Sequence, residues 1–188
     1  VDLSNLQRQI LHATPRIGTT KVDSAIETLR AVNPDVRLEG HKGSVNEQTL
    51  PSLLEGTHAV VDCSDNFATR YALNEACFRA RVPLVSGAAI RAEGQVSVFP
   101  GRPGGPCYQC LYPREGGVDE TCSANGVLAP LVGIVGSIQA TETLKVLLGV
   151  GEPLTGRLLL VDAMAMELRT VRLPADPRCP VCGEPASA

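Results

Sequence analysis

Two pairs of closely spaced cysteines have the most distinctive chemistry in this chain. They are Cys107-Tyr108-Gln109-Cys110 and Cys179-Pro180-Val181-Cys182, each with proline or glycine nearby. One such pair can give two thiolates to a tetrahedral ion, and two pairs complete a four-thiolate zinc site. Two disulfides or two redox dithiols are the alternatives, although a redox pair normally opens a helix after a strand. The sequence therefore favours a structural zinc knuckle formed by 107–110 and 179–182, with no open position for catalysis.

A second group of residues has the donors that phosphate binding needs. The segment Ser4-Asn5-Leu6-Gln7-Arg8-Gln9 combines three side-chain amides with an arginine, and Lys21 stands at the start of a predicted helix. The amides and dipole at a helix N-terminus favour anions, arginine makes forked contacts to phosphate oxygens, and lysine acts there as a point charge. The alternative is a solvated loop followed by a lysine that only begins a helix.

An acidic run follows a short apolar stretch that is predicted to be a buried parallel strand. This run is Asp62-Cys63-Ser64-Asp65-Asn66. Ligands of open α/β sheets bind at the carboxyl edge, where a carboxylate such as Asp65 can hold Mg²⁺ together with substrate phosphates. Alternatively, Asp65 only caps the next helix. Cations upstream and an acid at a strand end predict a nucleoside triphosphate site, although no Gly-x-Gly-x-x-Gly follows a strand here.

One further cysteine, Cys122, lies outside both pairs in a glycine-flanked loop at 116–125, which we expect to be mobile. A predicted helix follows it, and a helix N-terminus can lower a thiol pKa enough to make the cysteine a nucleophile. A spare loop cysteine is the alternative. Cys63 and Cys77 fall on apolar faces and are predicted to be core residues.

The elements that must position these residues alternate between strands and helices. Hydrophobic spacing, with Thr20 as one N-cap and the pair Asp65-Asn66 as another, predicts helices at 20–33 and 65–80. A further helix is predicted at 126–148 and a weaker one at 46–54. Strands are predicted at 36–41, 58–62, 82–87, 94–99, 158–162 and 167–173. This alternation predicts one α/β domain with a mainly parallel, partly mixed sheet.

Composition argues against several functional classes. The 188 residues carry a net charge of −3, from 17 basic and 20 acidic side chains, and only 3% are aromatic, so nucleic acid is a poor partner. The uncharged stretch 121–141 contains polar residues and glycines, so we expect a core helix rather than a membrane span. Seven cysteines without a secretory signal predict a cytoplasmic location.

Together, and in this order, these motifs resemble the ThiF/MoeB family of adenylyltransferases, which are related to ubiquitin-activating enzymes. The resemblance rests on the 4–9 run, Lys21, the 62–66 run, both cysteine pairs and the run Pro-Leu-Val-Ser-Gly-Ala-Ala-Ile-Arg-Ala-Glu-Gly-Gln at 83–95. It covers nearly the whole chain. It implies a Rossmann-like three-layer fold, usually in a homodimer.

The resemblance also implies an activity. The substrate would be a ubiquitin-like sulfur-carrier protein of the molybdopterin-synthase type, whose C-terminal Gly-Gly carboxylate attacks the α-phosphate of Mg-ATP. The products are an acyl adenylate and pyrophosphate, and sulfur transfer then gives a thiocarboxylate. A thiamine-pathway or cysteine-biosynthesis carrier remains an alternative substrate, and a non-catalytic zinc-stabilised module that binds the carrier is an alternative function. A nicotinamide dehydrogenase is disfavoured, because the glycine fingerprint and an acid–base pair for hydride transfer are missing.

Individual roles follow from the same resemblance. Lys21 matches the lysine that neutralises the triphosphate, and Asp65 matches the Mg²⁺-linked aspartate. Arg8 matches an arginine that reaches the nucleotide of the partner subunit, and Cys122 matches a loop cysteine that joins the carrier covalently in some members. The nucleotide-binding set implied is Ser4, Asn5, Arg8, Gln9, Lys21, Asp65 and Asn66, and the zinc ligands are Cys107, Cys110, Cys179 and Cys182.

The family pattern has further elements ahead of the position that Val1 occupies. These are a helix, a strand, the glycine-rich phosphate loop and a second strand ending in an acid for the ribose. We therefore expect residues 1–188 to form an adenylyltransferase domain without its adenosine cradle, and to bind ATP weakly or not at all on their own.

Overall fold

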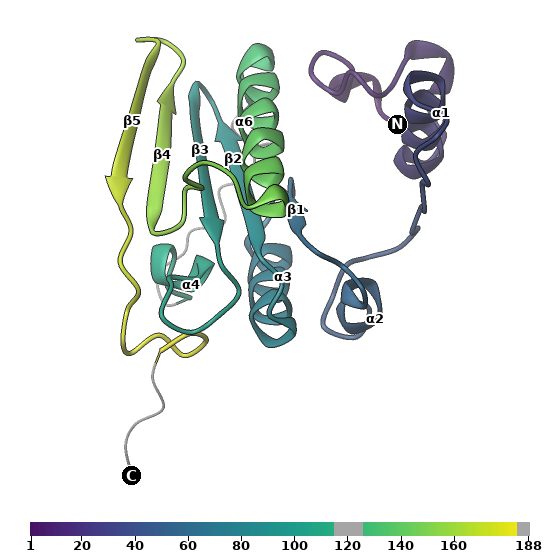
Figure 1. The fold of residues 1–188 in the computed structure, drawn as a ribbon. Coiled ribbons are helices and arrows are strands. Elements are labelled where there is room, and N and C mark those ends of the chain that lie inside the picture. Colours follow the sequence, from purple (N-terminus) through teal and green to yellow (C-terminus); the bar gives the residue numbers. More distant parts are fainter. Residues whose placement is uncertain (115–125, 184–188) are drawn as a thin grey trace. The chain divides into compact units, whose positions relative to one another are not determined.

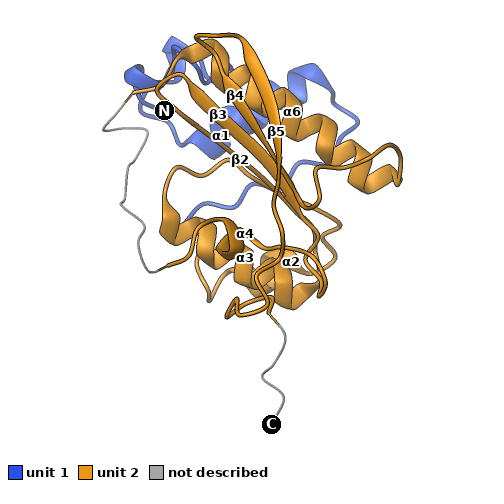
Figure 2. Ribbon diagram, turned by 90° about the vertical axis from the view of Figure 1, so that its left-hand side faces the viewer, with its two compact units in different colours: residues 1–44 blue, residues 45–188 orange. Residues whose placement is uncertain are grey.

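The structure is a computed structural model that describes residues 1–114 and 126–183. It divides into two compact units, residues 1–44 and 45–188, which are coloured separately in Figure 2. Cys122 and the loop predicted at 116–125 lie outside the described residues.

The first unit contains two 3₁₀ turns, η1 (Leu3–Asn5) and η2 (Thr14–Arg16), and the helix α1 (Lys21–Val32). Thr20 caps α1 as predicted, since its hydroxyl accepts a hydrogen bond from the Asp23 amide at 3.1 Å. This bond satisfies one of the amides that a helix start leaves without a partner. Local signals therefore place Lys21 at the first helical position.

The prediction of a strand at 36–41 is wrong. These residues form a bend and irregular backbone, and this unit, all of which is described, contains no strand with which they could pair. A strand needs a neighbour for its amides and carbonyls, which two alternating apolar side chains, Val36 and Leu38, do not supply. Val36 is half exposed, at 50%.

The second unit is built on a five-stranded sheet in the order β1-β2-β3-β4-β5 (Figure 1). The strands are β1 (Val60–Asp62), β2 (Leu84–Ile90), β3 (Glu93–Phe99), β4 (Arg157–Asp162) and β5 (Glu167–Arg172). The sheet is mixed, but the expectation of a mainly parallel one is wrong. Among the five described strands, β1 and β2 pair in parallel, and the three other pairings are antiparallel.

Connection lengths explain the antiparallel pairings. β2 ends at Ile90 and β3 begins at Glu93, so Arg91 and Ala92 alone join them, and Arg91 adopts a positive φ of 52°. Antiparallel strands can be joined by a tight hairpin, whereas a parallel crossover needs a dozen or more residues. The long connection through α3 (Phe67–Ala80) is what allows β1 and β2 to run in parallel.

Helices cover both faces of the sheet, which gives three layers in this unit (Figures 1 and 2). Neighbouring residues of a strand point to opposite faces. Val85 packs with α6 (Ala129–Leu148) in one hydrophobic cluster, whereas Leu84 packs with α3 and α4 (Tyr108–Leu111) in another. The short helix α2 (Leu50–Leu54) lies against α3.

The helix α6 is long and apolar enough to cross a membrane by length and composition alone. One of its faces packs on the sheet, however, and that face includes Gln139 and Glu142, which are 3% and 4% exposed. Such buried polar groups, each hydrogen-bonded to the backbone of other elements, suit a core helix. Pro130 lies in the first turn rather than interrupting the helix, and Gly149 ends it at a φ of 65°.

Candidate functional site

The four cysteines of the two pairs come together in the second unit. Their sulfur atoms all lie within 4.8 Å of one another. Cys107 Sγ is 3.5 Å from Cys179 Sγ, and Cys110 Sγ is 3.3 Å from Cys182 Sγ, with all four thiols free. A tetrahedral ion with zinc–sulfur bonds of about 2.3 Å requires sulfurs about 3.8 Å apart. The arrangement therefore fits one metal ion with four soft ligands.

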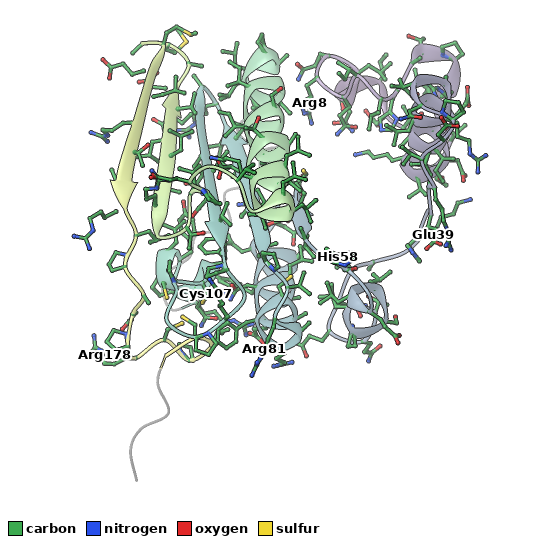
Figure 3. All side chains as sticks on the ribbon, in the orientation of Figure 1. Arg8, Glu39, His58, Arg81, Cys107 and Arg178 are labelled. Carbon is green, nitrogen blue, oxygen red and sulfur yellow. The ribbon has the colours of Figure 1, made fainter. Side chains whose placement is uncertain are left out.

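Two segments far apart in the sequence form this knuckle. Cys107 immediately precedes α4, where Figure 3 labels it, and Cys179 and Cys182 lie in the turns that follow β5. The amide of Asp176 donates to Cys110 Sγ at 3.4 Å. Burial raises the pKa of Cys107 to about 11. A bound cation would supply the positive charge that keeps such a buried sulfur deprotonated at neutral pH.

Asp65 lies where the sequence predicts, just after β1 and just before α3. Asn66, and not Asp65, caps α3, because its side chain accepts a hydrogen bond from the Thr69 amide at 2.9 Å. Asp65 is therefore not required as the cap. It is exposed and lines a pocket of about 320 Å³.

This pocket opens beside the carboxyl ends of β1 and β2, at the edge that open α/β sheets use for ligands. Its wall includes Tyr112, whose hydroxyl donates to Gln95 Oε1 at 2.8 Å. The other lining residues combine apolar and charged side chains: Phe67, Arg70, Ala88, Ala89, Ile90, Glu93, Gly94 and Leu160.

Sequence reasoning missed Arg70, Glu93, Gln95 and Tyr112 as residues of this pocket. Glu93 and Gln95 belong to the 83–95 run on which the family resemblance rests, so a signal was present for them. Arg70 had a weaker signal, namely a charged residue one turn after the predicted cap of an apolar helix. Cys63, predicted to be a core residue, is exposed, whereas Cys77 is buried as predicted.

The predicted phosphate-binding residues upstream belong to the first unit. Arg8, labelled in Figure 3, donates through Nη2 to Asn5 Oδ1 at 2.7 Å and through Nη1 to the Ser4 carbonyl at 3.3 Å. The structure thus brings these three residues together. Gln9 follows them, and its Oε1 is buried without a hydrogen-bond partner among the described residues.

Lys21 is exposed at the first position of α1. Burial lowers the pKa of His12, and the charge of Lys21 lowers it further. His12 therefore favours its neutral form, with Nδ1 2.8 Å from Ser24 Oγ. Because Lys21 and Arg8 belong to one unit and Asp65 to the other, their convergence around one polyphosphate stays a prediction.

Comparison with known proteins identifies the family. A sequence profile of the ThiF family matches residues 1–181. The chain belongs to the ThiF family. It is 45% identical over 184 residues to molybdopterin-synthase adenylyltransferase of Escherichia coli, covering 98% of this chain and 74% of that protein. It is 44% identical over 190 residues to sulfur carrier protein adenylyltransferase of Thermus thermophilus, covering 98% of this chain and 70% of the relative.

Another ThiF-family relative is the SAMP-activating enzyme E1 of Haloferax volcanii, which is 47% identical over 186 residues, 98% of this chain and 68% of that protein. Among solved structures, Escherichia coli MccB with ATP superposes with a TM-score of 0.80 at 18% identity. The match covers 97% of this chain and 56% of MccB, so the chain spans little more than half of that protein. At this identity the likeness shows a shared fold only.

Proposed function

We propose that this chain belongs to an ATP-dependent adenylyltransferase that activates a ubiquitin-like sulfur-carrier protein of the molybdopterin-synthase type. The observation that carries the proposal is the identity of 45% to molybdopterin-synthase adenylyltransferase along nearly the entire chain. Relatives named for sulfur-carrier adenylylation and SAMP activation, at 44% and 47% identity, support the same reaction class. A thiamine-pathway carrier is the alternative substrate.

The proposed reaction transfers AMP to a carboxylate. An oxygen of the carrier's C-terminal Gly-Gly carboxylate attacks the α-phosphorus of ATP, a P–O bond to the carboxylate forms, and the bond to the β-phosphate oxygen breaks. The products are the acyl adenylate and pyrophosphate, which takes the electron pair of the broken bond. Because negative charge moves onto the leaving pyrophosphate, fixed cations and positioning supply most of the catalysis.

The residues of the first unit fit the triphosphate side of this reaction. Lys21 neutralises charge on the phosphates, and Asn5, with Ser4 and Gln9 beside it, offers polar side-chain groups to phosphate oxygens. Arg8 contacts the nucleotide of a partner subunit, so that the active form is a homodimer. The Asn5–Arg8 hydrogen bond supports this proposal, because it orders the guanidinium group of Arg8. An ordered guanidinium group can donate two parallel hydrogen bonds to phosphate oxygens.

The pocket beside β1 and β2 fits the carboxylate side. Asp65 would hold Mg²⁺, an ion that uses one or two carboxylates and completes its shell with water and phosphate oxygens. When bound, that ion supplies charge neutralisation at the phosphates. We propose that the carrier tail enters through this pocket, whose lining includes Tyr112 and Asp65, because two glycines carry no side chains and need little room.

The four-cysteine knuckle holds zinc in this proposal, and its role is structural. Four protein ligands leave no coordination position for a substrate. An ion held by these four residues would join α4 and the residue before it to the segment after β5. We further propose that the enzyme acts in the cytoplasm, where thiols stay reduced.

Carrier-dependent exchange of labelled pyrophosphate into ATP by the full-length protein tests the proposal. Exchange that requires the carrier's intact Gly-Gly end supports it, and a carrier ending in Gly-Ala is the matched control. Binding of the carrier without any exchange would instead support the non-catalytic binding module. Running molybdopterin-type and thiamine-type carriers in parallel distinguishes the two candidate substrates.

Cys122 is proposed to act after adenylation, if the carrier is passed to a thiol. We expect Cys122→Ala to leave pyrophosphate exchange within about twofold of the wild type, because adenylate formation needs no thiol nucleophile. Thiocarboxylate formation, followed by mass spectrometry of the carrier, is the step that the substitution would slow. Loss of pyrophosphate exchange would contradict this assignment.

A further inference from the structure

Arg70 contacts two parts of the second unit that the proposed function treats separately. It lies in the first half of α3, only 8% exposed. Its Nη2 donates to the carbonyl oxygen of Ser64 at 2.6 Å, and its Nη1 donates to the hydroxyl of Tyr108 at 3.4 Å. Ser64 immediately precedes Asp65, and Tyr108 lies between the metal-binding candidates Cys107 and Cys110. One guanidinium group therefore joins the acidic loop to the knuckle.

On the side of the loop, the arginine also compensates a buried charge. Asp62, the last residue of β1, is 2% exposed, and its Oδ2 is 4.0 Å from Arg70 Nε. Its Oδ1 accepts a hydrogen bond from the Ser64 amide at 2.9 Å. A carboxylate this deeply buried needs a nearby positive charge, and loss of one partner of such a pair is strongly unfavourable. Arg70 thus holds both ends of the segment 62–64.

The helix on the opposite face of the sheet, α6, binds the same segment independently. Gln139 of α6 donates through Nε2 to the carbonyl oxygen of Asp62 at 2.8 Å and to that of Val85 at 3.3 Å. A Cβ at Gly87 would lie 2.3 Å from Gln139 Cδ, so glycine is required there for this approach. The backbone at the end of β1 is therefore anchored from one face, while Ser64 depends on Arg70 from the other.

On the side of the knuckle, two residues of α3 bind Tyr108, one at its amide and one at its hydroxyl. The Tyr108 amide donates to Asn74 Oδ1 at 2.8 Å, and Tyr108 itself is 1% exposed. Its ring packs edge-on against Phe99 and Tyr71. The position of Tyr108 is therefore tied to α3 and to the folding of the knuckle around it.

We infer that Arg70 is a positioning residue that couples the folded four-cysteine knuckle, through Tyr108, to the loop that presents Asp65. The consequence for catalysis rests on the proposed function, in which Asp65 holds Mg²⁺. The coupling itself rests only on the contacts of Arg70. It gives the structural knuckle a second effect, because opening the knuckle would loosen the acidic loop as well.

Hydrogen–deuterium exchange of the full-length protein tests the coupling without using activity. In the wild type, removal of the metal by a chelator is expected to raise amide exchange at 107–110 and also at 63–66. Arg70→Lys keeps the positive charge but cannot make both guanidinium hydrogen bonds. It is expected to raise amide exchange at 63–66 about tenfold before chelation, and chelation is then expected to raise it little further. Tyr108→Phe removes only the hydroxyl, and we expect it to raise amide exchange at 63–66 about threefold.

Arg79→Lys is the matched control, since Arg79 lies on the same helix, is exposed and pairs with Glu75 at 3.2 Å. It is expected to change exchange in neither segment. Unchanged exchange at 63–66 in folded Arg70→Lys, or after chelation that opens 107–110, would overturn the inference.

The catalytic consequence is measured as the Mg²⁺ concentration that gives half-maximal pyrophosphate exchange. Arg70→Lys is expected to raise it about tenfold, as is typical when an outer contact of a metal ligand is lost. A purely structural role would lower the amount of active enzyme and leave the Mg²⁺ dependence unchanged, which would overturn the inference. A wild-type enzyme that shows no pyrophosphate exchange at all would refute the proposed function. The amide hydrogen–deuterium exchange at 63–66 would still decide whether Arg70 couples the knuckle to the loop.

Discussion

The four-cysteine knuckle and the cationic segment of the first unit both carry chemistry, but they are held in opposite ways. Three of the four cysteines are buried, at 3%, 6% and 8% exposure, and Phe78 of α3 packs against them. Lys21 is exposed, and the side-chain hydrogen bonds of Arg8 within the described residues go to Asn5 and Ser4, three and four positions away. The knuckle is thus part of the packed fold, whereas the cations depend on local contacts. Substitutions should therefore separate stability from activity.

Loss of one knuckle cysteine should have the largest effect. We expect Cys182→Ser to abolish stoichiometric metal binding and to lower stability by about 4 kcal/mol, because it removes a ligand from a buried site that joins two distant segments. For a protein of this size, that corresponds to a fall in the melting temperature of about 10 °C.

Calorimetry and metal analysis of the full-length protein measure these changes. Cys63→Ser is the control, since Cys63 is exposed and lies outside the four-sulfur cluster. Equal melting temperatures for Cys182→Ser and the wild type would show that the knuckle does not stabilise the fold.

Asp65→Ala should separate activity from stability within the second unit itself. The side chain is exposed and Asn66 caps the helix, so we expect the melting temperature to change little. Pyrophosphate exchange should fall about 10³-fold, because the substitution removes the carboxylate proposed to hold Mg²⁺. The exposed acid Glu55 at the end of α2 is the control, as Glu55→Ala should change neither quantity. Exchange that survives at ordinary Mg²⁺ concentrations would contradict the metal assignment.

Lys21→Ala should have a somewhat smaller effect on activity and none on stability. We expect pyrophosphate exchange to fall about 10²-fold, through loss of one fixed positive charge near the leaving group. A lysine in the first turn opposes the helix dipole, so its removal should not destabilise α1. Arg30→Ala, at the other end of the same helix and also exposed, is the control that should stay active. A melting temperature that falls along with activity would show that Lys21 stabilises the fold rather than acting on the substrate.

Local signals in the sequence predicted the elements that carry these residues. Thr20 and Asn66 cap their helices where expected, because an N-cap is decided by a few neighbouring residues. The convergence of the two cysteine pairs was also predictable, since four thiolates with this spacing have a common chemical purpose.

Features that depend on distant partners could not be predicted in the same way. Gln139 matters through the carbonyl oxygen of Asp62, and Arg70 through the hydroxyl of Tyr108, and both partners lie far away in the sequence. Nothing in the residue types of Gln139 or Arg70 indicates which distant group it meets. The direction of strand pairing depends on connection lengths, which in turn depend on exact strand ends. Boundaries are the least certain part of a pattern, so the sheet was expected to be more parallel than it is.

Thr20→Ala should have the smallest effect on stability and activity. It tests how far the cationic segment depends on local contacts. It removes the hydroxyl that accepts from the Asp23 amide, which costs about 1 kcal/mol of helix stability. We expect amide exchange at 21–24 to rise about fivefold while the second unit is unaffected, because the loss is confined to the first turn of α1. Pyrophosphate exchange should fall only in proportion to the lost order of Lys21, and Thr20→Ser, which keeps the cap, should restore both. A fall as large as that of Lys21→Ala, with unchanged amide exchange, would instead mean that Thr20 contacts the substrate directly.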